Sequence, residues 1–258
     1  VCFYITVAFL IGYLFWPYFY YIKNETLIVL SIFAIWRYGW QSLHYFRAFI
    51  YGNYLYPKLM RLSSELPIGE KYPDHVYFII PSYNEEPWVS REALHSVFSE
   101  LGQIPSNATI IAATGSDEDD AIISSIYESH PVKYKVDLIF QRQSKGKRIA
   151  MGHALRSAAR RHSQIADDPN SVTIFMDGDT YLMPGTLQKA LPFFSALPKL
   201  GALTTNEVAF IKSESSWYKS WFNLKFGQRH ILFQSHSLSK RVLTLTGRFS
   251  AFRSSIVM

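Results

Sequence analysis

The chain has 258 residues, 48% of them hydrophobic and 16% aromatic, with a formal net charge of +6. This length holds one large domain, or a smaller domain with an anchor. The single cysteine, Cys2, excludes an internal disulfide framework and a cysteine-rich zinc site. The basic balance favours a phosphorylated small molecule or an anionic lipid surface, and nucleic acid is disfavoured because no recognition motif for it occurs.

Residues 1–48 predict a membrane anchor with two transmembrane helices. Residues 1–22 contain no charged side chain, and as a helix this segment is long enough to cross a bilayer core of ~30 Å. A second apolar stretch runs from Thr26 to about Phe46 and includes Arg37 and His44. The alternatives are a signal peptide for the first stretch and a buried helix for the second.

Basic residues follow the second stretch, at Arg47, Lys58 and Arg61, whereas the loop between the stretches has only Lys23. Positive charge is enriched in the cytoplasmic flanks of membrane spans. We therefore expect a multi-pass protein of the bacterial inner (plasma) membrane whose catalytic domain is cytoplasmic.

After a linker or interfacial segment at residues 49–74, residues 75–258 predict one α/β domain that is incomplete at its C-terminal end. Apolar runs predict strands at Val76–Ile80, Ala108–Ala113, Val136–Phe140 and Val172–Met176. Periodic apolar residues and capping signals predict helices at Pro87–Gly102, Asp117–Ser129 and Arg148–Arg161. This order implies a mostly parallel sheet with flanking helices, which binds ligands at the carboxyl ends of its strands.

The strongest chemical signal is Asp177-Gly178-Asp179, directly after the last of these strands. Two carboxylates one residue apart can reach a common Mg²⁺ or Mn²⁺, which would neutralise a departing diphosphate. Taken alone the motif is weak, because Asp-Gly is also common in β-turns.

Two other strand-end loops support a nucleotide site. Tyr83, Asn84 and Glu85 follow the first strand, where a tyrosine can stack on a nucleobase and its polar neighbours can bind base or ribose. Residues 142–148 place four cations around a glycine before a helix, which suits a phosphate. The alternatives are an ordinary turn and a solvated basic loop.

The order Pro-Ser-Tyr-Asn-Glu (81–85), Gly-Lys-Arg (146–148) and Asp-Gly-Asp (177–179) resembles the family-two glycosyltransferases, which include cellulose, chitin and hyaluronan synthases. A narrower similarity, to the catalytic subunits of alginate (mannuronan) polymerases, covers nearly the whole chain. It rests on residues 35–38, 201–207, 227–230, 238–248 and 252–253. The resemblance implies a GT-A-like fold and a metal-dependent inverting hexosyltransferase that uses a nucleotide-sugar donor.

The resemblance also implies a role for each matched residue. The nucleoside would contact Tyr83, Asn84 and Glu85, and the diphosphate Lys147 and Arg148. The catalytic metal pair would be Asp177 and Asp179, with Asp179 the principal ligand. The acceptor side would be lined by Thr246, Gly247 and Arg248. The family's catalytic base would follow Met258, and we expect Glu207 to be a hydrogen-bonded strand-end residue instead.

The predicted function is synthesis of an exopolysaccharide, namely alginate (polymannuronate) from GDP-mannuronate. Arg229, Arg241 and Arg248 are candidates for pairing with the uronate carboxylate. The partners implied are a growing polysaccharide, the lipid bilayer and a subunit that senses cyclic-di-GMP. The alternatives are a polymerase using a UDP-sugar, a non-processive glycolipid transferase and an inactive scaffold. Residues 213–234 predict an amphipathic helix, at the membrane face or against a C-terminal part of the protein.

Overall fold

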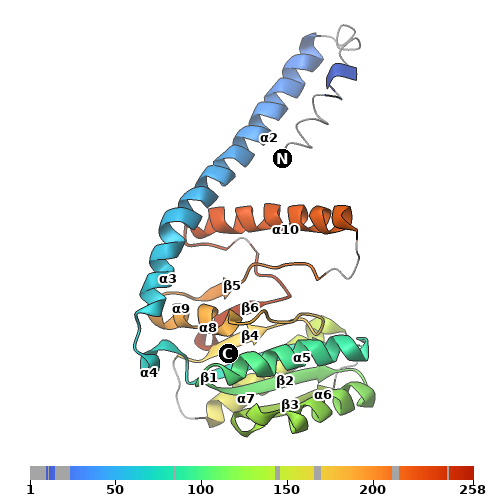
Figure 1. The fold of residues 1–258 in the computed structure, drawn as a ribbon, viewed down its shortest axis with the longest axis vertical. Helices are drawn as coiled ribbons and strands as arrows, with labels where there is room; N and C mark the ends of the chain where they lie inside the picture. The colour runs from blue at the N-terminus through green and yellow to red at the C-terminus, as the bar shows by residue number, and fades with distance from the viewer. Residues whose placement is uncertain are drawn as a thin grey trace.

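The computed structural model describes residues 10, 12–14, 24–83, 85–142, 146–165, 170–210, 215–242 and 244–258. Within them lies a six-stranded sheet of order β3-β2-β1-β4-β6-β5 (Figure 1). Its parallel part consists of β1 (His75–Ser82), β2 (Asn107–Thr114), β3 (Val136–Arg142) and β4 (Val172–Phe175). The predicted α/β class, the mostly parallel sheet and these four strands are confirmed.

Strand β1 lies at the centre of the parallel part, and all of its residues are buried. Because side chains alternate along a strand, Val76, Phe78 and Ile80 enter the core on one face of the sheet. On the other face, Tyr77 and Ile79 pack against a smaller cluster. A strand buried on both faces explains the unbroken apolar run in the sequence.

The three predicted helices form on the two faces of this sheet. Helices α5 (Pro87–Gly102) and α6 (Asp117–Ser129) pack on the face of the larger core, and α7 (Lys147–Gln164) covers the opposite face. The Ser116 side chain caps α6 by accepting a hydrogen bond from the Asp119 amide. The small side chains of α7 allow close approach to the sheet; they are Ala150, Ala154 and Ala158.

The other edge of the sheet is antiparallel and was not predicted. Strand β6 (Ser250–Arg253) pairs with β4, and β5 (Ala202–Thr204) pairs with β6. The short helices α8 (Thr186–Ala190), α9 (Pro192–Ala196) and α11 (Ser254–Val257) complete this edge. Strands of three and four residues are too short to show a periodic pattern.

A helical stem precedes the domain. It consists of α2 (Asn24–Ile50), the π-helix η1 (Tyr51–Leu55), α3 (Tyr56–Ser64) and α4 (Ile68–Lys71). Figure 1 shows α2 projecting beyond the domain, with α10 (Ser216–Ser237) crossing between the stem and the sheet. Elements η1, α3 and α4 lie in the segment predicted as linker or interfacial, and the division at residues 48 and 74 stays a prediction.

Helices α2 and α10 meet through polar contacts. The Arg47 guanidinium donates to the Ser235 carbonyl (2.9 Å) and to its hydroxyl (3.1 Å). His44 Nδ1 lies 2.8 Å from the same hydroxyl. Ser235 is fully buried, so these hydrogen bonds fix where α10 crosses the stem.

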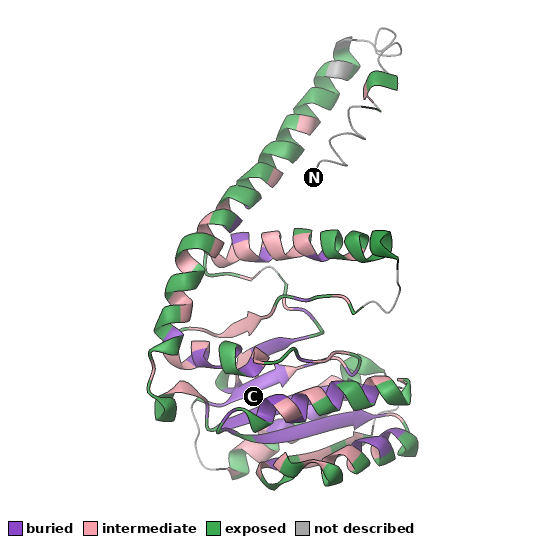
Figure 2. Cartoon of the chain, viewed as in Figure 1, coloured by how far each residue is buried: buried purple, intermediate pink, exposed green. Residues whose placement is uncertain are grey.

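The prediction of two transmembrane helices needs correction. The first predicted span, residues 1–22, lies mostly outside the described residues. The second is part of α2, whose 27 residues are long enough but include Arg37, Gln41 and His44. Among the helices that the structure describes, none is both long and apolar enough to cross a membrane. In Figure 2 most of α2 is nevertheless exposed.

Candidate active site

The Asp-Gly-Asp motif follows β4 at the carboxyl edge of the parallel strands. A Cβ atom on Gly178 would lie 2.8 Å from the Pro81 carbonyl oxygen and 3.3 Å from the Ser82 Cα. The glycine is therefore required by the close approach of the motif to the end of β1. The Asp177 side chain is partly buried, and the Asp179 side chain is exposed.

The amino end of α7 lies beside this motif, and Lys147 in its first turn forms an ion pair with Asp177. Gly146 precedes the helix with φ of +89°, a conformation that favours glycine. The free amides of a helix start and a lysine together make a site for an anionic phosphate. Lys147 thus lies beside the Asp-Gly-Asp motif, and its predicted role at the diphosphate stays a prediction.

The other basic residues of the predicted loop have different environments. Arg142 forms ion pairs with Asp117 and Asp120 in the first turn of α6, the second at 2.8 Å. Its charge is thus used to join β3 to α6. Arg148 is exposed. Residues 143–145 of the loop lie outside the described residues.

Tyr83 lies at the end of β1 with 71% of its surface exposed. Its ring lies against Gly115, at the end of β2, so closely that a Cβ on Gly115 would be 2.8 Å from the ring. An exposed ring fixed along one side can present the other side to a planar ligand. Asn84 lies outside the described residues.

Glu85 lies in an acidic environment. Burial, together with the neighbouring carboxylates of Asp179, Asp119 and Asp177, raises its pKa, and Lys147 partly offsets this. Glu85 therefore lies close enough to the Asp-Gly-Asp motif for the carboxylates to repel one another.

The predicted acceptor-side residues also reach this site. Thr246 is buried, and its hydroxyl lies 3.3 Å from that of Thr204 in β5. A Cβ on Gly247 would be 3.2 Å from the Asp177 carboxylate, so the chain passes directly beside the motif. Arg248 turns the other way and donates to Glu207 Oε2 at 2.9 Å.

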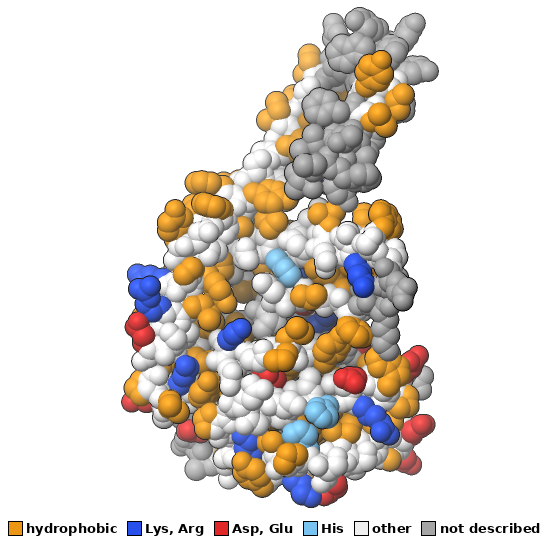
Figure 3. Space-filling model, in the orientation of Figure 1, with side chains coloured by type: hydrophobic (Ala, Val, Ile, Leu, Met, Phe, Trp, Pro, Cys, Tyr) orange, Lys and Arg blue, Asp and Glu red, His pale blue; other side chains and the backbone are white. Residues whose placement is uncertain are grey.

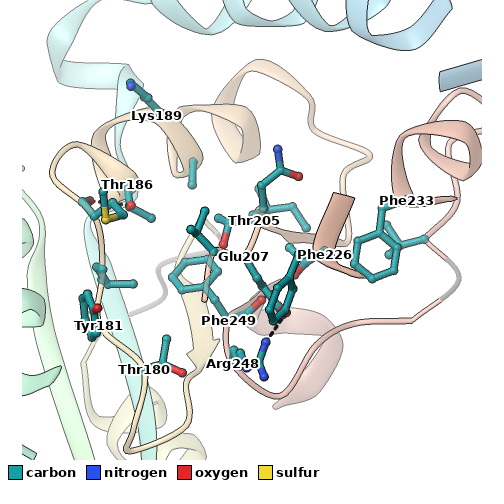
Figure 4. A pocket seen from close by; sticks show the side chains of 18 of the residues that line it. Thr180, Tyr181, Thr186, Lys189, Thr205, Glu207, Phe226, Phe233, Arg248 and Phe249 are labelled. Carbon is teal, nitrogen blue, oxygen red and sulfur yellow. Dashed lines mark hydrogen bonds and ion pairs between the residues drawn. The ribbon is translucent and has the colours of Figure 1, made fainter. Parts of the chain in front are cut away.

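A pocket of about 1300 Å³ extends from Asp179 to α10 and the start of α3. Figure 4 shows its wall, with Glu207, Phe226 and Arg248 close together and the Arg248–Glu207 ion pair as a dashed line. The lining combines aromatic rings with charged and polar groups such as Asp179, Glu207 and Arg248, a composition typical of small-molecule sites. The aromatic residues lining it include Trp88, Tyr181, Phe210, Phe222, Phe226, Phe233 and Phe249.

Glu207 is a candidate functional residue whose contacts were not predicted from the sequence. As expected it is hydrogen-bonded beyond a strand, but it also receives Arg229 at 3.0 Å and Arg248 at 2.9 Å. Its backbone N–H donates to His230 Nε2 at 3.0 Å. Burial lowers the pKa of His230, in keeping with a neutral ring that accepts this hydrogen bond.

Comparison with known proteins identifies the family. Residues 73–258 match the family described as Glycosyltransferase like family 2. The chain belongs to this family. Both the family and the narrower similarity predicted from the motifs are thereby confirmed.

Two relatives show how far the similarity of this family-2 glycosyltransferase extends. A protein named glycosyltransferase alg8, from Pseudomonas syringae pv. tomato, is 31% identical over 237 residues, 91% of this chain and 46% of that protein. The hyaluronan synthase of Streptococcus pyogenes is 27% identical over 255 residues, covering 92% of this chain and 56% of the synthase. The chain thus spans about half the length of the curated relatives it matches.

A solved structure agrees on the fold of this glycosyltransferase. The mannosyltransferase of Pyrobaculum calidifontis, in complex with GDP-mannose and Mn²⁺, aligns with a TM-score of 0.51 and 20% identity. The alignment covers 85% of this chain and 54% of the mannosyltransferase. The predicted GT-A-like fold is confirmed.

Proposed function

We propose that this family-2 glycosyltransferase is an inverting enzyme that transfers sugar from a nucleotide donor to a growing exopolysaccharide. One observation carries the proposal: Lys147, Asp177 and Gly247, from three distant parts of the chain, meet at one sheet edge. The pocket that opens beside them begins at Asp179. Cation, carboxylates and an adjoining aromatic pocket are what a sugar diphosphate requires.

The donor nucleotide would lie across the strand ends. Tyr83 would stack on the base, while Asn84 and Glu85 would bind base or ribose. The diphosphate would lie at the start of α7, near Lys147 and Arg148, where the helix dipole and the lysine both favour negative charge. The positions of Tyr83, Glu85 and Lys147 at the sheet edge support this assignment.

The site suits a divalent cation, Mg²⁺ or Mn²⁺. Asp177 is paired with Lys147, whereas Asp179 is exposed at the pocket and offers its oxygens to an ion, so Asp179 would be the principal ligand. Among the described residues, no set of three or more acidic, histidine or cysteine side chains could hold a metal. The ion would therefore complete its shell with phosphate oxygens and water, as Mg²⁺ often does. When bound, it supplies positive charge to the departing diphosphate.

The protein residues would position the reactants. Lys147 holds Asp177 in place and adds a cation beside the diphosphate. The backbone at Gly247 brings the Thr246–Arg248 loop against the motif, so an acceptor bound there approaches the donor sugar. Attack by the acceptor hydroxyl also needs a base. We do not assign this role to Glu207, because one oxygen of its buried carboxylate already accepts hydrogen bonds from both Arg229 and Arg248.

The donor we favour is GDP-mannuronate, and the product alginate. A uronate carboxylate in a closed site needs a cation, and arginine binds it through two hydrogen bonds. Arg229 and Arg248 share one carboxylate and so keep a net positive charge beside the pocket. Arg241 follows α10 and is exposed, and it is not paired with Glu207 as the other two arginines are. A neutral UDP-sugar is the alternative donor.

We also propose that the stem attaches the enzyme to a membrane, the inner membrane of a bacterium, with the catalytic domain cytoplasmic. Many large apolar side chains of α2 are exposed, among them Ile32, Phe33 and Trp36. Trp217 and Trp221 at the start of α10 stack on each other and are exposed. Figure 3 shows hydrophobic side chains along the stem and where it meets the domain. Exposed aromatic residues of this kind favour a membrane interface.

A donor panel tests the proposed reaction. The full-length protein, with Mg²⁺ or Mn²⁺, is given radiolabelled GDP-mannuronate, UDP-glucose, UDP-glucuronate and UDP-N-acetylglucosamine. We expect polymer only from GDP-mannuronate. Incorporation from a neutral UDP-sugar alone would refute the alginate assignment and leave a transferase. Failure to bind or turn over any nucleotide sugar would refute the proposed function as a whole.

A further inference from the structure

The two carboxylate oxygens of Glu207 differ in their hydrogen bonding. Its side chain is only 6% exposed, and Oε2 accepts hydrogen bonds from both Arg229 and Arg248. The other oxygen, Oε1, is buried and has no hydrogen-bond partner among the residues that the structure describes. Leaving such an acceptor unpaired costs roughly 1–3 kcal/mol, and more for a charged group.

The groups around Glu207 keep this carboxylate from turning away. The Arg248 guanidinium lies 5.0 Å from the centre of the Phe226 ring, and that of Arg229 lies 5.6 Å from the centre of the Phe233 ring. The Glu207 backbone is held by His230. Since Arg229 and His230 are both in α10, one helix fixes the main chain and the side chain of Glu207.

Glu207 also lines the pocket that begins at Asp179. A ligand that paired with Oε1 would have to donate a hydrogen bond to a carboxylate. A cation is disfavoured there by the two arginines, and a carboxylate or phosphate anion has no hydrogen to donate to Oε1. A neutral hydroxyl remains, and the neighbouring rings of Phe226 and Phe249 suit the C–H faces of a sugar.

We infer that Glu207 Oε1 accepts a hydrogen bond from a sugar hydroxyl in this pocket, with Arg229 and Arg248 as the positioning residues. The inference rests on the proposed glycosyltransferase function and adds to it a specific sugar contact. The hydroxyl could belong to the donor sugar or to the acceptor chain. The same hydrogen-bond chemistry serves both, and the experiment separates them.

The test compares Glu207→Gln with Glu92→Gln in the full-length protein. The first substitution keeps the volume of the side chain and removes the charge that strengthens the hydrogen bond. Glu92 is an exposed carboxylate that lines the same pocket and to which we assign no role. Binding of GDP and of GDP-mannuronate is measured by calorimetry, and the KM for a mannuronate oligosaccharide by transfer.

We expect Glu207→Gln to leave the affinity for GDP unchanged and to weaken one sugar ligand roughly tenfold, the difference between a charged and a neutral acceptor. Weaker GDP-mannuronate binding assigns the hydroxyl to the donor, and a raised oligosaccharide KM assigns it to the acceptor. Glu92→Gln should stay within about twofold of the unmodified protein in both arms.

If Glu207→Gln lowers the yield of folded protein, Glu207→Asp makes the same test. It keeps the charge that the arginines need and withdraws the oxygens by one methylene, so the same ligand should weaken. Unchanged sugar binding in the folded variant, or equal losses for GDP and GDP-mannuronate with an unchanged oligosaccharide KM, would overturn the inference. Lack of nucleotide-sugar binding by the unmodified protein would instead refute the proposed function.

Discussion

The two halves of the sheet build their parts of the site in different ways. On the parallel half, the candidate residues lie in short segments after a strand or at the start of a helix, as Tyr83, Asp177 and Lys147 do. On the antiparallel half, the central residue is Glu207, whose partners Arg229 and Arg248 are 22 and 41 residues away in sequence. The site residues of the parallel half can thus be recognised from short sequence motifs, whereas the contacts of Glu207 on the antiparallel half are seen only in the folded chain.

The largest expected effect is on the parallel half. Replacing Asp179 by Asn should lower turnover by roughly 10²–10³-fold, as loss of one preorganised electrostatic group does in other enzymes. The fold should survive because the side chain is exposed. Turnover and melting temperature are measured beside Asp74→Asn, an exposed carboxylate preceding the opposite end of β1. Near-normal polymer synthesis by folded Asp179→Asn would remove the metal pair from the mechanism.

The next effect concerns the nucleobase. Tyr83→Ala should weaken binding of the donor nucleotide by roughly 1–3 kcal/mol, the usual contribution of a base–aromatic stack. Calorimetry with GDP measures it without any sugar. The matched control is Tyr134→Ala, since Tyr134 is an exposed ring away from the site, between α6 and β3. Equal GDP affinity for both variants would show that Tyr83 does not stack on the base.

A smaller effect should follow from Gly115→Ala. The added methyl would meet the Tyr83 ring at 2.8 Å, so the ring must move. We expect GDP to bind up to about tenfold more weakly, within the 0.5–1.5 kcal/mol typical of aromatic contacts. In the Tyr83→Ala background the same change should have little effect on GDP binding. Additive losses in the double variant would mean that Gly115 acts independently of the ring.

The smallest effect is on stability against acid. Burial lowers the pKa of His75 to about 4 from its ordinary value of 6.5, with Asp137 opposing the shift and Arg161 and His162 adding to it. Between these two values the unfolded chain binds more protons than the folded one, so stability falls as pH falls from 6.5 towards 4. Urea unfolding of His75→Gln should show a flatter pH dependence there. An unchanged slope would show that other groups dominate acid unfolding.

The sequence predicted the parallel half well because its signals are local. Strands β1, β2 and β4 are buried, mostly apolar runs, whereas β3 is only partly buried. Helix α6 was predicted with its observed bounds because Ser116 and four acidic residues mark its start. Strands β5 and β6 were missed because neither is a buried apolar run like β4: β5 is only partly buried, and β6 mixes apolar residues with Ser250 and Arg253. The partners of Glu207 were missed because neither the sequence of α10 nor that of the loop before β6 reveals that Arg229 and Arg248 meet at residue 207.

The loop at residues 246–248 touches both halves within two residues. Gly247 lies against Asp177 at the donor end, and Arg248 holds Glu207 in the pocket. Asp177 and Glu207 are thus neighbours of one short loop, the first beside Gly247 and the second bonded to Arg248. Where binding at one end alters affinity at the other, thermodynamic linkage makes the change equal in both directions. If a nucleotide bound at the donor end changes the affinity of the pocket for sugar, bound sugar changes the affinity for the nucleotide by the same factor. The coupling is therefore measurable from either site.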